Sequence, residues 1–509
     1  MQPANLSADR QAEIRRRISP AYDPAILVSA GSRLMELLGR HLESVQNREG
    51  PVLNWRPPAE NLAAAGETLA APAGPLAEIP DRFEELARLV LAHGQNLHHP
   101  RYVGHQVPAS IPLAGLFDAL GAISNQVMAV YEMGPFVTAV EKVLVEQLGM
   151  RIGWPAGTFA GFATHGGSLA NLTALLTARN VALPRAWEQG LATAGNPVLV
   201  TGADSHYSIA RAAGVLGLGT EQVVKAELDS RRRMDPVRLD TLLRRLRDDG
   251  RPVIAVAASC CATPIGAFDP LPEIAEVCRR WNVWLHVDAA HGGGALFSDR
   301  HRSLLVGIDQ ADSVVWDAHK MLFVPALCAF VFYRKAEHRF DAFRQSAPYL
   351  FDPAAPGGAD FDLGLQTLEC TKRAAALGLW GAWSVFGPGL FADLVDLTFD
   401  LTRKLHQLLT EQPDFTPLHE PQCNILAFRY LPVELAGAGP AEVGDFQLAL
   451  RRQVIESGDF YLAPVKLDGV GALRVTLINP LTTLQDLHDL LNTLRRHGRE
   501  VLHAVDILK

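Results

Sequence analysis

The stretch from about residue 96 to residue 385 constrains the fold most, because short apolar runs alternate there with amphipathic segments of helical period. The apolar runs predict strands at Pro197–Thr201, Gln222–Ala226, Val253–Ala258, Val283–Val287, Ser313–Trp316 and Ala326–Tyr333. Such runs, separated by helices, are typical of a mostly parallel sheet that is covered on both faces. The sequence therefore predicts an α/β protein.

Two further segments flank this region. Residues 1–95 contain helical patterns on either side of a Pro- and Ala-rich stretch, and they are too short to bury a core of their own. We expect them to form an arm that packs on the main body or on a partner subunit. Residues 386–509 predict a smaller α+β domain, with helices at Leu390–Leu409, Gln447–Ser457 and Leu484–His503 and strands at Asn424–Arg429 and Ala472–Ile478. The predicted domains are 1–95, 96–385 and 386–509.

Composition excludes several classes of protein. Lys and Arg number 47 against 55 Asp and Glu, a net charge of −8, which argues against a nucleic-acid partner. Six cysteines are too few for a disulfide scaffold, and the N-terminus has no apolar segment of the secretory kind. The longest apolar run, Met321–Tyr333, is shorter than the roughly 20 residues of a membrane span. We expect a cytoplasmic protein without a membrane partner.

Polar residues follow three of the predicted strands, in Ser205-His206, in Asp288–His291 and in Asp317–Lys320. Ligands of open α/β sheets bind at the carboxyl ends of strands. Pyridoxal phosphate would use a lysine for its aldehyde, a buried aspartate for its ring nitrogen, and the helix start at Thr164–Ser168 for its phosphate. Each feature alone is also an ordinary turn or surface residue, but chance explains the combination poorly.

Seven segments resemble one known family: HPRYVGHQ (99–106), GWPAGTFAGFATHGGSLANL (153–172), GADSHYSIARAAG (202–214), GAFDP (266–270), WLHVDAAHGGGALFSDRHR (284–302), GIDQADSVVWDAHKML (307–322) and ALRVTLINP (472–480). They look like the group II pyridoxal-phosphate-dependent decarboxylases, which act on glutamate, aspartate, cysteine sulfinate, 2,4-diaminobutyrate or aromatic amino acids. The resemblance runs collinearly from about residue 30 to residue 500. It implies fold type I, the aspartate-aminotransferase-like fold, and a homodimer with active sites at its interface.

The resemblance also implies roles for individual residues. Lys320 would form the Schiff base with the cofactor, with His319 beside it, and Asp288 would pair with the pyridine nitrogen. The remaining cofactor contacts would be Ala290 and His206 on the two ring faces, Gly167 and Ser168 at the phosphate, and Thr263. Arg474 matches an arginine that contacts a substrate carboxylate, and His105 and His291 would lie near the substrate. We expect no metal, because the spacing of His98, His99 and His105 matches no standard ligand set.

The chain departs from the family pattern at several positions. Asp317 replaces an asparagine, His291 replaces Trp or Tyr, and the adjacent Cys260 and Cys261 lie near the expected site. Gly357, in the Pro- and Gly-rich loop 352–360 that we expect to be mobile, falls where glutamate-type relatives carry a tyrosine that protonates the substrate α-carbon. Tyr349, His291 or a water would then supply that proton, or the reaction is not simple decarboxylation.

Three hypotheses follow. The first is a pyridoxal-phosphate-dependent decarboxylase of an L-amino acid with an acidic side chain, which releases an amine and CO₂. The second keeps the cofactor and changes the reaction, to oxidative deamination to an aldehyde or to another lyase or transfer reaction. The third is a catalytically silent scaffold, which the presence of Lys320, Asp288 and His206 argues against.

Overall fold

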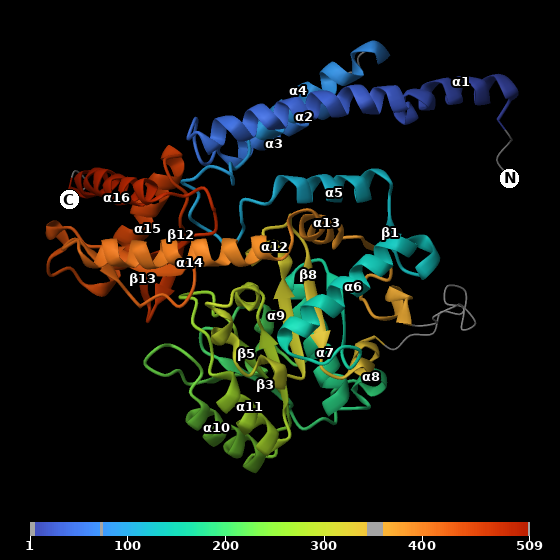
Figure 1. The fold of residues 1–509 in the computed structure, drawn as a ribbon. Helices are drawn as coiled ribbons and strands as arrows, with labels where there is room; N and C mark the ends of the chain where they lie inside the picture. The colour runs from blue at the N-terminus through green and yellow to red at the C-terminus, as the bar shows by residue number, and fades with distance from the viewer. Residues whose placement is uncertain (1–5, 72–74, 344–359, 507–509) are drawn as a thin grey trace. The chain divides into compact units, whose positions relative to one another are not determined.

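A computed structural model of the 509-residue chain describes residues 6–71, 75–343 and 360–506 (Figure 1). The chain divides into two compact units. The first unit comprises Met1–Tyr102, Ala449–Tyr461 and Leu481–Lys509, and the second comprises Val103–Leu448 and Leu462–Pro480. Among the described residues, no helix is both long enough and apolar enough to cross a membrane.

The second unit is built around a seven-stranded sheet of order β2-β8-β7-β6-β5-β3-β4. Its strands are β2 (Ala160–Thr164), β3 (Val198–Gly202), β4 (Val223–Ala226), β5 (Val253–Ser259), β6 (Trp284–Asp288), β7 (Ser313–Asp317) and β8 (Ala329–Tyr333). β8 runs antiparallel to both of its neighbours and the other pairs are parallel, so six strands point the same way. Every residue of β2, β3, β7 and β8 is buried, because helices cover both faces of the sheet.

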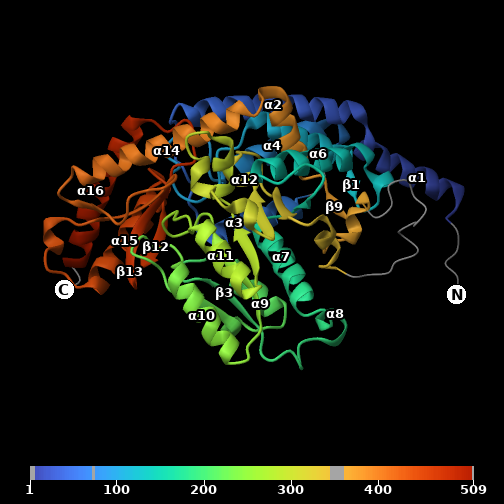
Figure 2. The same cartoon turned by 60° about the horizontal axis from the view of Figure 1, so that its bottom comes forward.

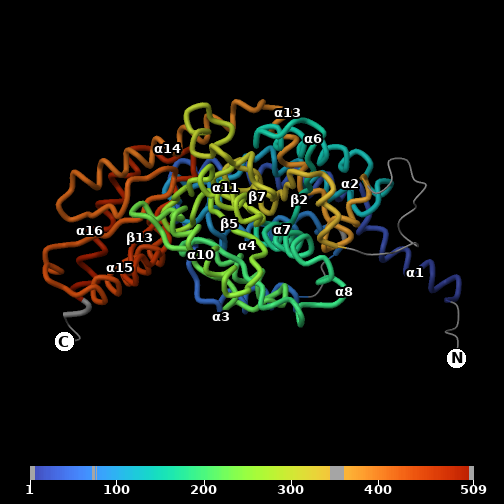
Figure 3. The backbone as a smooth tube through the Cα atoms, turned by 90° about the horizontal axis from the view of Figure 1, so that it is seen from below, coloured from blue at the N-terminus to red at the C-terminus, as the bar shows by residue number. Residues whose placement is uncertain are grey.

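Along the chain, helices of this unit precede β2, separate most of the strands and follow β8. Figures 2 and 3 show the unit from two further directions. The helices are α5 (Pro112–Ile123), α6 (Pro135–Ile152), α7 (Gly167–Ala182), α8 (Ala186–Gln189), α9 (Ser208–Val215), α10 (Pro236–Asp248), α11 (Leu271–Trp281), α12 (Ala318–Met321), α13 (Leu377–Phe386) and α14 (Gly389–Thr410). α7 packs across five of the strands, and its residues Ala170, Ala174 and Ala178 are fully buried. These alanines let the helix approach the sheet closely at the carboxyl ends of the strands.

Two smaller sheets complete the second unit. β10 (Phe415–Pro417), β11 (Ile425–Tyr430), β13 (Val470–Thr476) and β12 (Ala463–Leu467) form an antiparallel sheet in that order, against which α14 packs. α15 (Pro440–Ser457) contributes residues to both units. β1 (Val127–Met128) pairs with β9 (Lys372–Arg373). The predicted three-domain division is not tested by this arrangement and stays a prediction.

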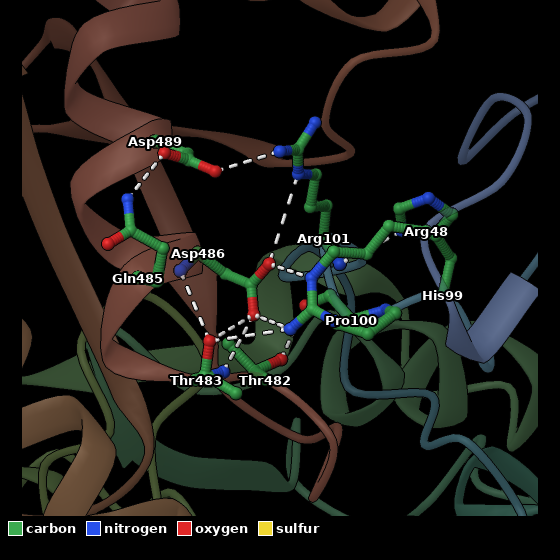
Figure 4. A network of polar contacts seen from close by, with 9 residues as sticks. All are labelled: Arg48, His99, Pro100, Arg101, Thr482, Thr483, Gln485, Asp486 and Asp489. Atoms are coloured by element: carbon green, nitrogen blue, oxygen red, sulfur yellow. Dashed lines mark hydrogen bonds and ion pairs between the residues drawn. The ribbon is translucent and has the colours of Figure 1, made fainter.

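The first unit holds α1 (Ala8–Ile18), α2 (Pro24–Gln46), α3 (Pro58–Ala70), α4 (Ile79–Ala92) and α16 (Leu484–Asp506). A polar network joins the end of α2 to the start of α16 (Figure 4). Arg48 donates from Nε and Nη2 to the two oxygens of Asp486, at 2.7 Å each. Thr483 adds its backbone N–H and its hydroxyl to Asp486, and Arg101 donates to Asp489 at 2.8 Å. We call this group the Asp486 clasp.

The structure confirms the predicted α/β class and most of the predicted strands. It differs at β2, which was not predicted because its sequence Ala-Gly-Phe-Ala-Thr has low intrinsic strand preference. The helix α3 likewise lies in a stretch whose prolines masked its helical pattern. β8 begins at Ala329, three residues later than predicted.

Candidate active site

The carboxyl ends of five strands of the large sheet meet at one cavity of about 270 Å³. Nine of the residues predicted for the site line it: Gly167, Ser168, His206, Thr263, Asp288, Ala290, His291, His319 and Lys320. These residues come from segments far apart in the sequence, and the parallel strand order is what brings them together.

Lys320 lies on α12, the short helix that directly follows β7, and its side chain is 19% exposed. Its Nζ atom lies 3.2 Å from Oδ2 of Asp317, the last residue of β7. His319 Nε2 lies 3.6 Å from the same oxygen. The Lys320 amine is therefore held at the cavity by a buried carboxylate, three residues before it in the chain.

Asp288, the last residue of β6, is held by a chain of hydrogen bonds. Asn171 Nδ2 donates to its Oδ2 at 2.9 Å, and the backbone N–H of Ala290 donates to its Oδ1 at 3.1 Å. Asn171 is itself fixed by His286, whose Nε2 lies 2.9 Å from the Asn171 Oδ1. Burial lowers the pKa of His286 to about 4, so this histidine is neutral at pH 7. The carboxylate is thereby aimed at the cavity.

His206 follows β3, and its contacts determine which ring nitrogen carries the proton. The backbone N–H of Ser208 points at its Nδ1 at 3.3 Å, and the Ser208 hydroxyl lies 2.8 Å from the same atom. Because a backbone N–H can only donate, Nδ1 is an acceptor, and the neutral ring carries its proton on Nε2. Burial lowers the pKa of His206, which favours this neutral form.

The start of α7 offers an anion site. Gly166, with φ of 107°, turns the chain, and the first backbone N–H groups of the helix have no acceptor within it. A Cβ atom on Gly167 would come within 2.7 Å of Asp317 Oδ2, so any other residue here would displace that carboxylate. An amine, an aimed carboxylate and an anion site around one cavity fit the aldehyde, ring nitrogen and phosphate of pyridoxal phosphate.

Asp317 is the feature of this site that fits a phosphate least. Its side chain is 2% exposed and points towards Gly167, with Oδ1 lacking any hydrogen-bond partner among the described residues. An anionic carboxylate thus lies beside the helix start that would hold an anionic phosphate. The replacement of an asparagine by Asp317, noted in the sequence, thus places a carboxylate beside the phosphate site.

His291 is buried, 3% exposed, and faces the cavity. Its Nε2 lies 2.8 Å from Asn424 Oδ1, whereas its Nδ1 has no hydrogen-bond partner among the described residues. Burial, together with the charges of Lys320 and Arg474, lowers the pKa of His291 to about 3. The ring is therefore neutral at pH 7.

The other predicted residues have varied positions. Arg474, on β13, is 6% exposed and donates from Nη1 to the Thr263 carbonyl at 2.9 Å, behind the lining of the cavity. His105 is exposed, and the neighbouring Gln106 lines the cavity. Tyr349 and Gly357, with most of the loop predicted at 352–360, lie outside the described residues. The roles of these residues stay predictions.

Several lining residues were not predicted, among them His165, Asn171, Ser259 and Leu327. His165 lies 3.0 Å from Glu369, and this contact lowers the pKa of Glu369. Asn171 lies one helical turn after Gly167, on the same face of α7. This spacing could have predicted from the sequence that Asn171 lines the site. The other residues carry no pattern that distinguishes them from neighbouring polar or apolar residues.

Comparison with known families gives the decisive observation: residues 69–431 match the model of the pyridoxal-dependent decarboxylase conserved domain. The chain belongs to this decarboxylase family. It is accordingly a carboxy-lyase that uses pyridoxal phosphate, as the residues of the cavity indicate. The expectation drawn from the sequence is thus confirmed for the family, the cofactor and the class of reaction.

Curated relatives and solved structures agree with this assignment of the decarboxylase. It is 32% identical over 458 residues to the human protein named acidic amino acid decarboxylase GADL1, covering 88% of this chain and 87% of the relative. The crystal structure of mouse CSAD matches with a TM-score of 0.86 at 27% identity, over 94% of this chain and 99% of that one. Rice TDC with PLP and tryptamine, at 20% identity and a TM-score of 0.85 over 94% and 98% of the two chains, shares the fold. Fold type I is confirmed.

Proposed function

We propose that this enzyme removes the α-carboxyl group of an L-amino acid with an acidic side chain, such as aspartate, glutamate or cysteine sulfinate. The observation that carries the reaction is the convergence of Lys320, Asp288 and the start of α7 on one cavity. The acidic side chain is supported by the name of the relatives that are 30–32% identical, acidic amino acid decarboxylase. The positive charge of Arg474 behind the cavity supports the same choice.

When bound, pyridoxal phosphate supplies an aldehyde for the substrate amine and a ring that takes up the electron pair left by CO₂. Lys320 Nζ supplies the amine that holds the aldehyde until substrate arrives. Asp288 keeps a proton on the ring nitrogen, because Asn171 and the Ala290 N–H fix its carboxylate in one orientation. The N–H groups of Gly167 and Ser168 would bind the phosphate, and Ala290 and His206 would lie on the two faces of the ring.

The remaining residues orient the substrate and the protons. His206 presents its Nε2 proton to the cavity. The carbonyl of Thr263 accepts from Arg474 on β13, so this bond connects the lining of the cavity to the four-stranded antiparallel sheet. We assign His319 to the support of Lys320, because its Nδ1 lies 2.8 Å from the Cys328 carbonyl. Tyr349 is our proposed donor of the proton that replaces the carboxyl group.

The products test this function. The purified holoenzyme is incubated separately with L-aspartate, L-glutamate, L-cysteine sulfinate, 2,4-diaminobutyrate and L-tryptophan, and CO₂, amine, aldehyde and peroxide are measured together. We expect one amine per CO₂ from an acidic substrate, without peroxide. Aldehyde with peroxide would favour the alternative reaction that Gly357 raises, and turnover of the aromatic or basic substrates alone would overturn the acidic class.

We also propose a cytoplasmic homodimer with the active sites at its interface. The support is an apolar face on α5, where Leu113, Leu116, Leu120 and Ile123 are 39–65% exposed at helical spacing. A second copy of this chain would bury that face. Analytical ultracentrifugation should give a dimer for the native chain and a smaller species for Leu116→Glu/Leu120→Glu; a monomeric native chain would contradict the proposal.

A further inference from the structure

His291 Nδ1 is a buried nitrogen, and contacts around the ring determine whether it carries a proton. The first of these contacts concern Asn424, which is fully buried. Its Nδ2 donates to the Leu477 carbonyl at 3.2 Å and to Met321 Sδ at 3.3 Å. A backbone carbonyl only accepts, so the amide nitrogen must face Leu477. The amide oxygen of Asn424 must then face His291 Nε2, which lies 2.8 Å away.

This chain of contacts selects one tautomer of His291. An amide oxygen only accepts, so Nε2 carries the proton and donates it to Asn424. Because the ring is neutral, with a pKa lowered to about 3 mainly by burial, Nδ1 carries a lone pair and no proton at pH 7. His291 is therefore not the donor of a proton to the substrate α-carbon, one of the three sources that the sequence left open.

The lone pair on Nδ1 needs a donor. A buried polar atom without a partner costs free energy, and none of the described residues donates to this atom. A substrate carboxylate has no proton to give and would meet the lone pair unfavourably. In the bound cofactor, Asp288 would engage the pyridine N–H, and the phosphate oxygens would accept. The ring hydroxyl and the Lys320 amine are donors as well, but the amine already contacts Asp317 Oδ2 at 3.2 Å. The α-amino group of the substrate brings further N–H donors into the same cavity.

We propose that His291 Nδ1 accepts a hydrogen bond from the α-amino group of the substrate and so positions that group for exchange with Lys320. Lys320 and His291 line the same cavity, and the incoming amine has to reach the carbon that Lys320 occupies. Asn424, whose amide is fixed by the Leu477 carbonyl, is the positioning residue that keeps the proton on Nε2 and so leaves Nδ1 as the acceptor. The inference rests on the proposed function in that the ligand is an amino acid.

The test compares two ligands that differ only in the amino group. The holoenzyme is reduced with borohydride, which fixes the cofactor on Lys320, so that amino acids bind without reacting. Dissociation constants are measured by calorimetry for the preferred acidic amino acid and for the dicarboxylate of the same length without an amine, for example L-glutamate and glutarate. Release of CO₂ by the unreduced enzyme is measured separately, so that failure of the proposed function is recognised independently.

His291→Phe should weaken binding of the amino acid about ten- to hundredfold and change binding of the dicarboxylate less than about twofold. His291→Asn, which keeps an acceptor near the position of Nδ1, should recover part of the loss. Asn424→Leu, of similar volume, should weaken amino-acid binding in the same direction by a smaller factor. His301→Phe, a buried histidine of the same unit that does not line the cavity, should leave both constants unchanged.

Equal weakening of both ligands by His291→Phe would overturn the proposal, since it would mean that the ring only shapes the cavity. Unchanged binding of the amino acid would overturn it as well. Should Asn424→Leu fail to fold, ¹⁵N chemical shifts of the His291 ring in the native chain give an independent measurement. A protonated Nδ1 at pH 7 would contradict the assigned tautomer.

Discussion

Two aspartates of this protein are equally hidden from solvent and differ in what surrounds them. Asp486, in the first unit, has a side chain that is 1% exposed, and both of its oxygens accept short hydrogen bonds from Arg48 and Thr483. Asp317, in the second unit, is 2% exposed, and its Oδ1 has no partner among the described residues. The first carboxylate is saturated, whereas the second retains an unused acceptor.

The difference separates a structural role from a functional one. A saturated buried ion pair fixes two segments and leaves nothing for a ligand, as the Asp486 clasp does for α2 and α16. Unsatisfied buried groups cost stability and persist where a ligand completes them. In the described part of the cavity, Asp317 Oδ1, His165 Nε2 and His291 Nδ1 are such groups. Substitutions should accordingly affect stability in the clasp and ligand binding in the cavity.

The largest effect is expected at Lys320. Lys320→Ala should lower decarboxylation at least about 10⁴-fold, because the described lining of the cavity holds no second lysine. The visible absorbance of the covalently held cofactor should vanish, while the free energy of unfolding, compared between the two apoenzymes, stays within about 1 kcal/mol of the native value. Retention of that absorbance would show that another lysine holds the cofactor.

Asp486→Ala tests the structural role assigned to the Asp486 clasp. The Asp486 carboxylate is 1% exposed and accepts hydrogen bonds from Arg48 and Thr483, so its removal should lower the free energy of unfolding in urea by about 2–3 kcal/mol. Affinity for the cofactor, measured on the folded fraction, should be unchanged. Asp489→Ala is the matched control on the same helix. The Asp489 carboxylate is 30% exposed, so the expected loss is about 1 kcal/mol or less.

Asp317→Asn removes the negative charge beside the phosphate site and adds an N–H donor. We expect the apoenzyme to bind pyridoxal phosphate about tenfold more tightly in a fluorescence titration. Asp299→Asn, at a side chain that is 98% exposed, should change nothing. Weaker binding in Asp317→Asn would mean that the contact of Asp317 with Lys320 outweighs its repulsion of the phosphate.

The smallest effect concerns acid stability near the Asp486 clasp. Burial, with the charge of Arg101, lowers the pKa of His99 from 6.5 to about 4, so the unfolded chain binds a proton there that the folded chain does not. Stability should therefore fall as the pH drops from about 6.5 towards 4. His99→Gln should reduce this fall by about 1 kcal/mol in urea unfolding at pH 7 and pH 5. An equal loss of unfolding free energy in the native chain and in His99→Gln would contradict the lowered pKa of His99.

Burial also raises the pKa of Asp486, but hydrogen bonds from Arg48 and Thr483 outweigh this effect and hold the pKa below its ordinary value. Its contribution to stability is present above the ordinary aspartate pKa and is lost as the pH falls through the lowered value. As the pH falls, the loss of stability that depends on His99 therefore precedes the loss that depends on Asp486.

Much of the fold was predictable because the relevant signals are local. The apolar runs of β5, β6 and β7 and the start of α10, which Asp235 caps, fix those elements without reference to the rest of the chain. β2 was missed since small residues form a strand there only through pairing with β8. The reversed direction of β8 follows from its neighbours and has no counterpart in its own sequence.

The site was predictable where motif and strand end coincide, as at Asp288, His206 and Lys320. It was not predictable where a contact joins distant segments. The Asn424 amide that fixes His291 lies 133 residues away in the chain, and no pattern links the two. The buried pair of Lys372 and Glu141, 2.7 Å apart and 1% exposed, is another example: Glu141 Oε1 also accepts from the Ala163 N–H of β2.

The assembly of the cavity from five strand ends has a consequence for the life of the protein in the cell. An unfolded chain scatters Gly167, His206, Asp288 and Lys320 over more than 150 residues, so it holds no cofactor site. Cofactor that binds only the folded state stabilises it by mass action, by about 2.7 kcal/mol at a concentration one hundred times the dissociation constant. Supply of the cofactor should then set the abundance of this enzyme as well as its activity, because chains that stay empty unfold and are degraded sooner.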